Sequence, residues 1–203
     1  MMANNFKLIL ITQNKDIAEE NRLLNNLFEA GLQLLHIRKP THTIQETRTL
    51  LKSIPPIFHP KIVLHNHYEL LTDFKLKGAH LPEKIRKAGN INLTKNIVST
   101  SFHALEDIKT EKLIFEYAFF SPVFKSISKQ GYEPSIESTQ IKDFFKVNRN
   151  KIKSPNIALG GITDKNILQL QDMGFAGAAC IGYIWENTDP VTQLKKLQKI
   201  IES

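Results

Sequence analysis

The chain has 203 residues, 41% of them hydrophobic, and a formal net charge of +7 at pH 7. This length and apolar content suit one globular domain over residues 1–203, and no Pro/Gly/Ser-rich linker divides it. The basic balance invites a nucleic-acid interpretation, but the lysines are spread along the chain and aromatic residues do not interleave with them as in a base-stacking surface. We therefore expect no nucleic-acid partner; a basic balance also suits an enzyme with phosphorylated substrates.

The N-terminus and the cysteine count indicate a compartment. The chain enters the apolar run "FKLILIT" almost directly, without the pattern of a signal peptide, and this run is too short to cross a membrane. Cys180 is the single cysteine, which rules out an intramolecular disulfide. We expect a cytoplasmic protein with no membrane partner.

Short apolar runs alternate with longer amphipathic segments along the chain. Most runs are continuously apolar, which is typical of strands buried on both faces. The eight predicted strands span residues 7–12, 32–38, 61–66, 78–81, 96–101, 117–123, 156–161 and 177–182. Helical spacing predicts helices between them, at residues 16–31, 43–54, 136–146, 163–174 and 189–201. Gly31 is a good C-cap, and Thr163 and Asp189 are plausible N-caps.

Eight strands alternating with helices predict an α/β fold, a single (β/α)8 TIM barrel. An open doubly wound sheet is the alternative. The eighth strand and the final helix favour the barrel, because a barrel must close. The connection after the fourth strand, residues 78–81, looks short and irregular, so we expect a degraded helix there.

Polar side chains gather where the predicted strands end, the face that carries the active site in such barrels. Five of the seven histidines fall at this rim: His36, His65, His67, His80 and His103. A lone histidine there is more often structural, but convergence from four strands favours function for some of them. Because side chains alternate along a strand, His65 and His67 cannot both face the interior. We expect His65 or Asn66 to contact the ligand and His67 to lie in the following loop.

Two glycine-containing strand ends indicate a phosphate site. Gly160 and Gly161 end a strand just before a helix, which lets the backbone approach a phosphate at the helix N-terminus. Ile181 and Gly182 end the next strand and add N–H donors; phosphate sites after strands seven and eight recur in barrels. A tight turn is the alternative interpretation of the glycine pair.

A polar loop and an arginine offer further anion contacts. Ser126 and Ser128 are followed by Lys129, so two hydroxyls and an ammonium could hold a second phosphate or a diphosphate. An ordinary exposed loop is the alternative. Arg38 follows a buried strand, where a guanidinium needs an anion such as a ligand carboxylate or phosphate.

The order of these segments resembles the thiamine-phosphate synthase family and its sister group, the TenI-type thiazole tautomerases, over residues 7–200. The similar segments are "LLHIRKP", "LHNHYELL", "GAHLPE", "STSFHALEDI", "FFSPVFKSISK" and "ALGGI". Both groups are (β/α)8 barrels. The resemblance implies small phosphorylated substrates: the synthase joins a hydroxymethylpyrimidine diphosphate to a thiazole phosphate, using magnesium and releasing diphosphate.

The resemblance also implies roles for individual residues. Four would hold the diphosphate: Arg38, Ser126, Ser128 and Lys129. Four would hold the thiazole phosphate, partly through their backbone: Gly160, Gly161, Ile181 and Gly182. Ser101 would line the pyrimidine pocket.

The chain departs from the family at the magnesium ligands. The family's Asn-Asp pair is His65-Asn66 here, and the second aspartate would fall near Ile85, with Glu83 the only nearby carboxylate. Imidazole and amide do not replace aspartate, because Mg²⁺ prefers hard oxygen ligands in octahedral geometry. We assign no metal ligand; Mg²⁺ is possible by resemblance alone, and synthase-type coupling is expected to be weakened.

These departures favour a metal-free alternative. A thiazole tautomerase moves a proton on a carboxythiazole phosphate, and histidine is the natural acid–base group near neutral pH. The tautomerases' strand-six histidine is Pro122 here, so His36, His65 or His103 would have to be catalytic. Two further hypotheses stay open: a non-catalytic binder of thiazole phosphate or thiamine phosphate, and a transition metal held by these three histidines. The sequence predicts no oligomeric state.

Overall fold

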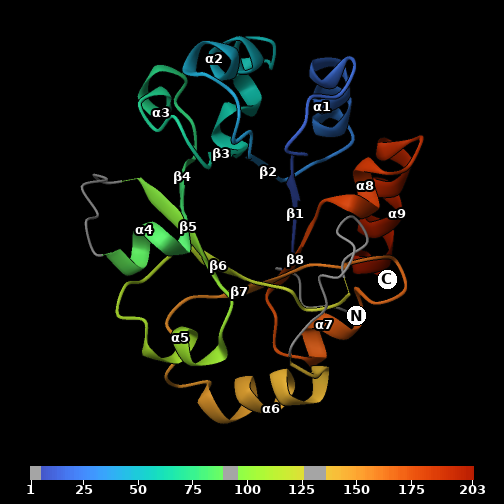
Figure 1. Ribbon diagram of the computed structural model, residues 1–203. Helices are drawn as coiled ribbons and strands as arrows, with labels where there is room; N and C mark the ends of the chain where they lie inside the picture. Colours follow the sequence, from blue (N-terminus) through green and yellow to red (C-terminus); the bar gives the residue numbers. More distant parts are fainter. Residues whose placement is uncertain (1–5, 89–95, 126–135) are drawn as a thin grey trace.

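The computed structural model describes residues 6–88, 96–125 and 136–203. Eight parallel strands form a closed barrel in which each strand pairs with the next one along the chain and β8 pairs with β1 (Figure 1). The strands are β1 (Lys7–Ile11), β2 (Leu34–Ile37), β3 (Ile62–Leu64), β4 (Gly78–Leu81), β5 (Ile97–Phe102), β6 (Tyr117–Phe120), β7 (Asn156–Leu159) and β8 (Gly177–Cys180). The predicted TIM barrel is confirmed, and the open sheet, which would leave two unpaired edges, is excluded.

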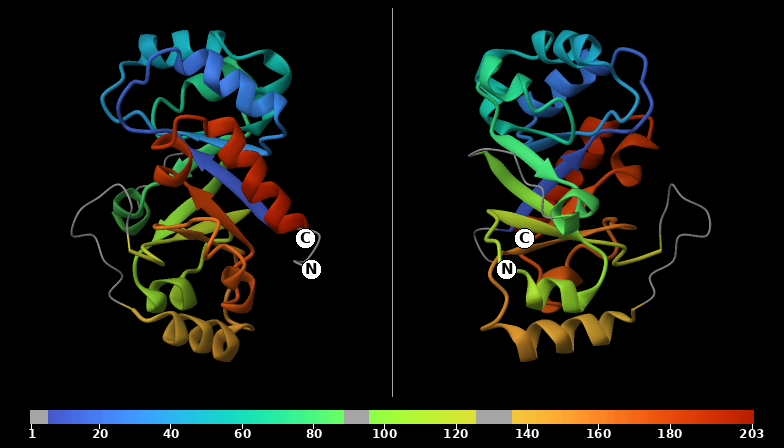
Figure 2. Two further views of the ribbon diagram at one scale, coloured as in Figure 1. Left: turned by 90° about the vertical axis from the view of Figure 1, so that its right-hand side faces the viewer. Right: turned by 60° about the vertical axis from the view of Figure 1, so that its left-hand side comes forward.

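Helices surround the barrel, with α2 and α3 on one side and α6 on the opposite side in the two side views (Figure 2). The helices are α1 (Glu20–Glu29), α2 (Ile44–Lys52), the 3-10 helix η1 (Pro56–Lys61), α3 (Leu70–Asp73), α4 (Glu83–Ala88), α5 (Leu105–Thr110), α6 (Ser138–Asn148), α7 (Gln169–Asp172), α8 (Gly182–Trp185) and α9 (Pro190–Glu202). Within the described part of the chain, no helix has both the length and the apolar character needed to cross a membrane.

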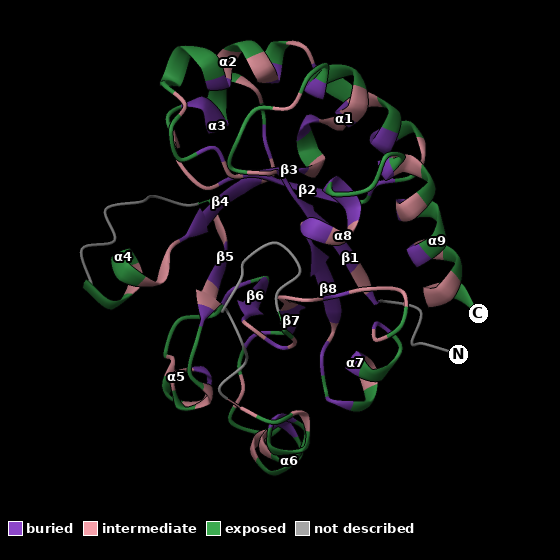
Figure 3. Ribbon diagram, turned by 45° about the vertical axis from the view of Figure 1, so that its right-hand side comes forward, coloured by how far each residue is buried: buried purple, intermediate pink, exposed green. Residues whose placement is uncertain are grey.

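The strands are buried on both faces, which explains their continuous apolar runs (Figure 3). Along β1, Leu8 and Leu10 pack in the core cluster that includes the helices, whereas Ile9 and Ile11 pack inside the barrel. Cys180 in β8 is also buried, and burial raises the pKa of its thiol to about 12. The barrel interior therefore forms a second core below the rim.

Four of the five predicted helices form close to their predicted positions, as α1, α2, α6 and α9. Gly31 adopts φ +93 just after α1, the left-handed geometry of a glycine that ends a helix. Asp189 caps α9 by accepting a hydrogen bond from the backbone N–H of Thr192, 3.0 Å away. Local capping chemistry therefore made these helix ends predictable.

The predicted helix at 163–174 is mostly turns, and only α7 within it is helical. The Asn166 side chain accepts a hydrogen bond from the backbone N–H of Thr163 and donates one to the carbonyl of Gly161. These bonds compete with helical backbone pairing, which shortens the helix. After β4, α4 covers 6 residues and buries none of its side chains, as expected for a degraded connection. However, α3 and α7 are shorter still, which the sequence did not indicate.

Candidate functional site

A cavity of about 540 Å³ lies at the carboxyl ends of the strands, and all eight strand ends contribute to its wall. A closed parallel barrel brings these ends to one rim, and the volume suits a small-molecule ligand. Nine residues predicted for the site line the cavity: Arg38, His65, Asn66, Ser101, His103, Gly160, Gly161, Ile181 and Gly182. The other predicted residues are His36, which lies below the cavity, and Ser126, Ser128 and Lys129, which fall outside the described residues.

His36 lies in β2 and is completely buried. Its Nδ1 is 2.9 Å from Nε2 of His65, and its Nε2 is 2.6 Å from the hydroxyl of Tyr117. His36 is not among the described residues that line the cavity. It therefore reaches a ligand only through its contact with His65. The sequence predicted His36 at the rim, whereas the structure places it below the cavity.

His80 was recognised at the rim but not assigned to the site, and the structure places it in the cavity wall. Its Nδ1 is 2.9 Å from Oγ of Ser99, and its Nε2 is 3.0 Å from Oγ of Ser101. Its ring stacks on His65 with centroids 4.2 Å apart and lies 5.3 Å from Phe119. In the sequence, the segment "GAHLPE" is the pattern that could have identified His80 as a site residue.

The imidazoles of His36, His65 and His80 are neutral at pH 7. Burial lowers the pKa of His36 well below its ordinary value, with a further contribution from His80. Burial likewise lowers the pKa of His65 well below its ordinary value, and that of His80 to about 3. A neutral imidazole has one donor nitrogen and one acceptor nitrogen, so each ring can link two hydrogen-bond partners.

The transition-metal hypothesis is tested by the geometry of this cluster. Ligand atoms of His36, His65 and His80 lie within 4.8 Å of one another. However, the rings of His65 and His80 are nearly parallel, at 17°, so their in-plane lone pairs do not converge on one ion. His103, the third ligand in the hypothesis, lines the same cavity but is not part of this cluster, and its Nδ1 lies 2.8 Å from the carbonyl of Ser121. The arrangement is a hydrogen-bonded stack rather than a preformed metal site.

The donors at the cavity wall also fit Mg²⁺ poorly. Among the described lining residues, Glu83 is the one carboxylate, and Lys87 Nζ lies 3.0 Å from it, with an Arg86 guanidinium nitrogen at 3.6 Å. Asn66 directs its amide nitrogen to the carbonyl of Lys39, 3.1 Å away, which leaves a single neutral oxygen. One neutralised carboxylate and one amide oxygen supply too few hard ligands for this ion.

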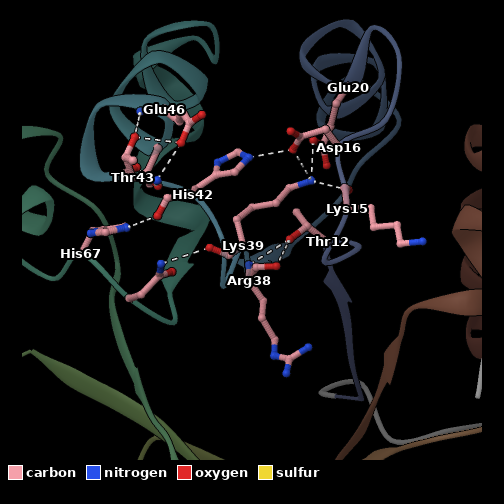
Figure 4. A network of polar contacts seen from close by, with 12 residues as sticks. Thr12, Lys15, Asp16, Glu20, Arg38, Lys39, His42, Thr43, Glu46 and His67 are labelled. Atoms are coloured by element: carbon pink, nitrogen blue, oxygen red, sulfur yellow. Dashed lines mark hydrogen bonds and ion pairs between the residues drawn. The ribbon is translucent and has the colours of Figure 1, made fainter.

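Arg38 and Lys39 leave the end of β2 in opposite directions (Figure 4). Arg38 lines the cavity, and its backbone N–H donates to Oγ1 of Thr12 at 2.9 Å. Lys39 is completely buried, and its ammonium contacts Glu20 at 2.7 Å and Asp16 at 3.4 Å. Lys39 therefore does not line the cavity, whereas Arg38 is placed to meet an anion.

The Lys39 contacts extend to the neighbouring strand ends (Figure 4). The His42 ring lies 2.7 Å from the Asp16 carboxylate, and the His67 ring lies 2.7 Å from the carbonyl of His42. His67 has φ +54 and lies in the loop after β3, as predicted. These contacts hold the ends of β2 and β3 together and fix the position of Arg38 and Asn66.

Gly160 and Gly161 form a turn against the segment that follows β6. They have φ +101 and +64, and a Cβ on Gly161 would lie 2.3 Å from the carbonyl oxygen of Lys125. The backbone N–H of Phe124 donates to the carbonyl of Gly160 at 3.1 Å. Close backbone packing thus accounts for the glycines, as in the tight-turn interpretation, while both still line the cavity.

Residues 8–184 match the protein-family model described as thiamine monophosphate synthase. The chain belongs to this family. It is 24% identical to the thiamine-phosphate synthase of Latilactobacillus sakei, over 95% of this chain and 88% of that protein. It is also 24% identical to the thiamine-phosphate synthase of Flavobacterium johnsoniae, over 95% of each chain.

Solved structures agree with this membership. A thiamine phosphate pyrophosphorylase from Bacteroides thetaiotaomicron superposes with a TM-score of 0.82 at 31% identity, covering 97% of this chain and 98% of that one. The thiamine phosphate pyrophosphorylase from Pyrococcus furiosus, at 19% identity and a TM-score of 0.77, supports the fold alone. The protein is thus a barrel of the thiamine monophosphate synthase family, an enzyme family of thiamine biosynthesis.

Proposed function

We propose that the protein is a cytoplasmic enzyme of thiamine biosynthesis that binds a thiazole phosphate in its cavity and transfers a proton on that ligand without metal. The observation that carries this proposal is the wall formed by His65 and His80, two neutral, stacked imidazoles beside Phe119. Such a surface suits the face of an aromatic thiazole ring and offers acid–base nitrogens to its edge.

Phosphate binding is proposed for the strand ends of β7 and β8. Gly160 and Gly161 line one side of the wall, and Ile181 and Gly182 continue it at the start of α8. Backbone N–H groups at such turns favour an anion. Arg38, half-buried at the same cavity, adds a guanidinium that pairs with phosphate or carboxylate.

Two histidines are candidates for direct proton transfer. His65 uses Nε2 to contact His36, which leaves Nδ1 for the ligand. His103 lies at the same wall, with Nε2 3.7 Å from the Glu83 carboxylate and Nδ1 2.8 Å from the carbonyl of Ser121. A neutral acceptor at His65 and a donor at His103 would together satisfy the needs of acid–base catalysis.

The second candidate function is thiamine-phosphate synthesis, which the names of the relatives favour. In that reaction magnesium would neutralise the diphosphate of the pyrimidine substrate. The weak set of magnesium donors, Glu83 and Asn66, argues against it. A non-catalytic binder of thiazole phosphate or thiamine phosphate is the third outcome of the experiments below.

Two assays on the purified chain separate these functions. In the first, the protein is incubated with hydroxymethylpyrimidine diphosphate, thiazole phosphate and magnesium, and product is detected as thiochrome fluorescence. In the second, a carboxythiazole phosphate is followed by proton NMR in heavy water. We expect catalysed hydrogen exchange, lost in His65→Gln, and no magnesium-dependent product. Robust magnesium-dependent coupling would replace the proposal by synthase activity, and ligand binding without exchange or coupling would identify a binder.

A further inference from the structure

A groove of about 640 Å³ lies at the end of the barrel opposite the cavity. It is bounded by α6, by the segment that leads into β7, and by the turn between α7 and β8 (Figure 1). Its lining residue Asn156 begins β7, and Ala176 immediately precedes β8, whereas the cavity lies at the carboxyl ends of the strands. The volume of this groove, here named the basal groove, suits a small molecule.

Four cationic side chains border the basal groove. Lys142 and Lys146 lie one turn apart on α6, and Arg149 follows at its C-cap, so the three share one face of the helix. Lys153 adds a fourth cation from the segment before β7, and all four side chains are exposed. Among the described lining residues, Asp172 is the one carboxylate. The lining therefore carries an excess of positive charge.

These cations lack acidic partners in the protein. Within the described part of the chain, none of the four forms an ion pair, and Lys153 donates only to the carbonyl of Lys112 at 3.2 Å. By contrast, Lys87 on α4 contacts Glu83 at 3.0 Å and Asp107 at 2.7 Å. Like charges one turn apart on a helix repel each other. An anion bound along this face of α6 would remove the repulsion.

Beside the cations the basal groove is apolar. Pro155 is exposed, and Ile152 and Ala176 are half-buried, so all three present apolar surface to it. Phe145 and Phe175 also line it and are almost completely buried, with ring centroids 5.0 Å apart at 69°. An edge-to-face aromatic pair gives this floor a fixed shape. A flat ring would bury apolar surface against it.

Gly174 sets the distance between α6 and the apolar floor. It has φ +95, and a Cβ at this position would lie 2.8 Å from the Cβ of Phe145. The turn after α7 therefore packs directly against α6, which only a residue without a side chain allows. Gly174 is itself exposed and lines the basal groove. The cationic face and the floor are thus held side by side.

The length of the cationic row indicates the charge of the ligand. An α-helix rises about 1.5 Å per residue, so Lys142 and Arg149 lie roughly 10 Å apart along α6. A single phosphate contacts only part of such a row, whereas a chain of two or three phosphates reaches neighbouring cations. Charge-assisted hydrogen bonds from Lys and Arg are the usual contacts of such groups.

We propose that the basal groove binds a small molecule in which a flat ring is joined to two or more phosphates. The ring lies on the apolar floor, and the phosphates lie along α6. Nucleotides have this chemistry, and so does the hydroxymethylpyrimidine diphosphate considered above. The basal groove and the cavity share no described lining residue, so this inference does not depend on the proposed function.

Isothermal titration of the full chain tests the basal groove with three probes: ATP, hydroxymethylpyrimidine diphosphate and inorganic triphosphate. We expect ATP or the pyrimidine diphosphate to bind more tightly than inorganic triphosphate, because the ring adds apolar contact. Lys146→Gln and Arg149→Gln should each raise the dissociation constant of that ligand about 10-fold, through loss of a charge-assisted hydrogen bond. The ligand whose affinity falls identifies the source, a nucleotide or the pyrimidine diphosphate.

Lys151→Gln is the matched control. Lys151 is an exposed neighbour that does not line the basal groove, and its substitution changes the net charge by the same amount. We expect this variant to keep the affinity of the wild type. Equal weakening by Lys151→Gln and Lys146→Gln would show only a general attraction to a basic surface and would overturn the site.

Three further results would also overturn the proposal. Binding that is unchanged in both Lys146→Gln and Arg149→Gln would place the ligand elsewhere on the protein. Inorganic triphosphate that binds as tightly as both ring compounds would remove the ring from the ligand. A peptide of glutamates that binds more tightly than any of the three probes, and loses affinity in Lys146→Gln, would replace the small molecule by an acidic protein segment. Since Lys146 and Arg149 are exposed, both variants are expected to fold, which circular dichroism checks.

Discussion

The imidazole of His65 stacks on that of His80, with centroids 4.2 Å apart and an interplanar angle of 17°. Two neutral rings pack well at this separation, whereas two charged rings would repel each other across a buried contact. The hydrogen-bond partners of His80, Ser99 and Ser101, hold its ring in this position. The wall of the cavity is therefore built around neutral histidines.

Stability is expected to fall with acid because of these histidines. The folded state lowers the pKa values of His36, His65 and His80, the last from 6.5 to about 3. Below pH 6.5 the unfolded chain therefore binds more protons than the folded one. The free energy of unfolding should decrease by about 1.4 kcal/mol per pH unit for each such histidine, as the pH falls from 6.5 toward their folded pKa values.

Urea denaturation at pH 7.5, 6.5 and 5.5 measures this dependence. Most carboxylates titrate below this range, so the histidines dominate the slope. His80→Gln should reduce the slope of the free energy of unfolding against pH by the contribution of one histidine. A free energy of unfolding that stays constant from pH 7.5 to 5.5 would show that the three rings are not held neutral.

Arg38→Ala should weaken the binding of a phosphorylated ligand without unfolding the protein. Loss of a charge-assisted hydrogen bond costs about 1.5–3 kcal/mol, or roughly 10- to 100-fold in dissociation constant. Arg38 is half-buried at the cavity, so we expect a change in the free energy of unfolding within about 0.5 kcal/mol.

Isothermal titration with thiazole phosphate checks the prediction for Arg38. Arg48→Ala is the control, because Arg48 lies on α2 and pairs with Asp73 at 2.9 Å. The Arg48→Ala substitution removes the same charge, but at a position away from the cavity. Equal affinity in the wild type and Arg38→Ala would remove Arg38 from the site.

Lys39→Met should destabilise the fold strongly. Its ammonium is buried against the Glu20 carboxylate at 2.7 Å, and the substitution would leave that carboxylate without its partner. Breaking a buried ion pair costs about 3–5 kcal/mol. The double variant Lys39→Met with Glu20→Met should recover much of this loss, because no buried charge remains.

Chemical denaturation of the three variants measures the coupling between Lys39 and Glu20. Lys15→Met is the control, since Lys15 is an exposed neighbour whose backbone carbonyl, not its side chain, contacts Lys39. A double variant no more stable than Lys39→Met would show that packing rather than charge makes Lys39 important.

Gly161→Ala should destabilise the protein by about 2 kcal/mol or more, because the new Cβ would lie 2.3 Å from the Lys125 carbonyl oxygen in a left-handed backbone conformation. Gly160→Ala is the matched comparison, since its Cβ would lie 3.1 Å from Pro122 and meets a less severe contact. Thermal unfolding of both variants ranks the two positions. A larger loss of stability in Gly160→Ala than in Gly161→Ala would show that the closest backbone contact is not at Gly161.

The barrel was predictable because burial on both faces leaves a direct trace in the sequence, namely continuous apolar runs between amphipathic helices. The same alternation placed Arg38, His65 and Asn66 at the rim, and the structure agrees. The alternation predicts which face of the strand a side chain occupies. It does not predict how deep in the barrel that side chain lies, because this depth depends on the stagger between neighbouring strands. His36 pairs with Val63 of β3, well inside the barrel, and this register could not be derived from β2 alone.

The proximity of Tyr117 to Ser99 was invisible in the sequence for a related reason. Tyr117 and Ser99 occur within apolar runs, where each reads as an ordinary strand residue. Only the pairing of β5 with β6 brings them together below the cavity. Likewise, α7 is short because the Asn166 side chain binds the backbone of Thr163 and Gly161, a contact that helical periodicity does not report.

The burial of Cys180 makes the wild-type chain a convenient host for chemical labels. It is the single cysteine, and with a thiol pKa of about 12 it holds almost no reactive thiolate at neutral pH. A cysteine introduced at the exposed Asn14, whose side chain contacts Arg38, would therefore react alone with a maleimide dye. Fluorescence from that position would report ligand capture in real time, with the core left untouched.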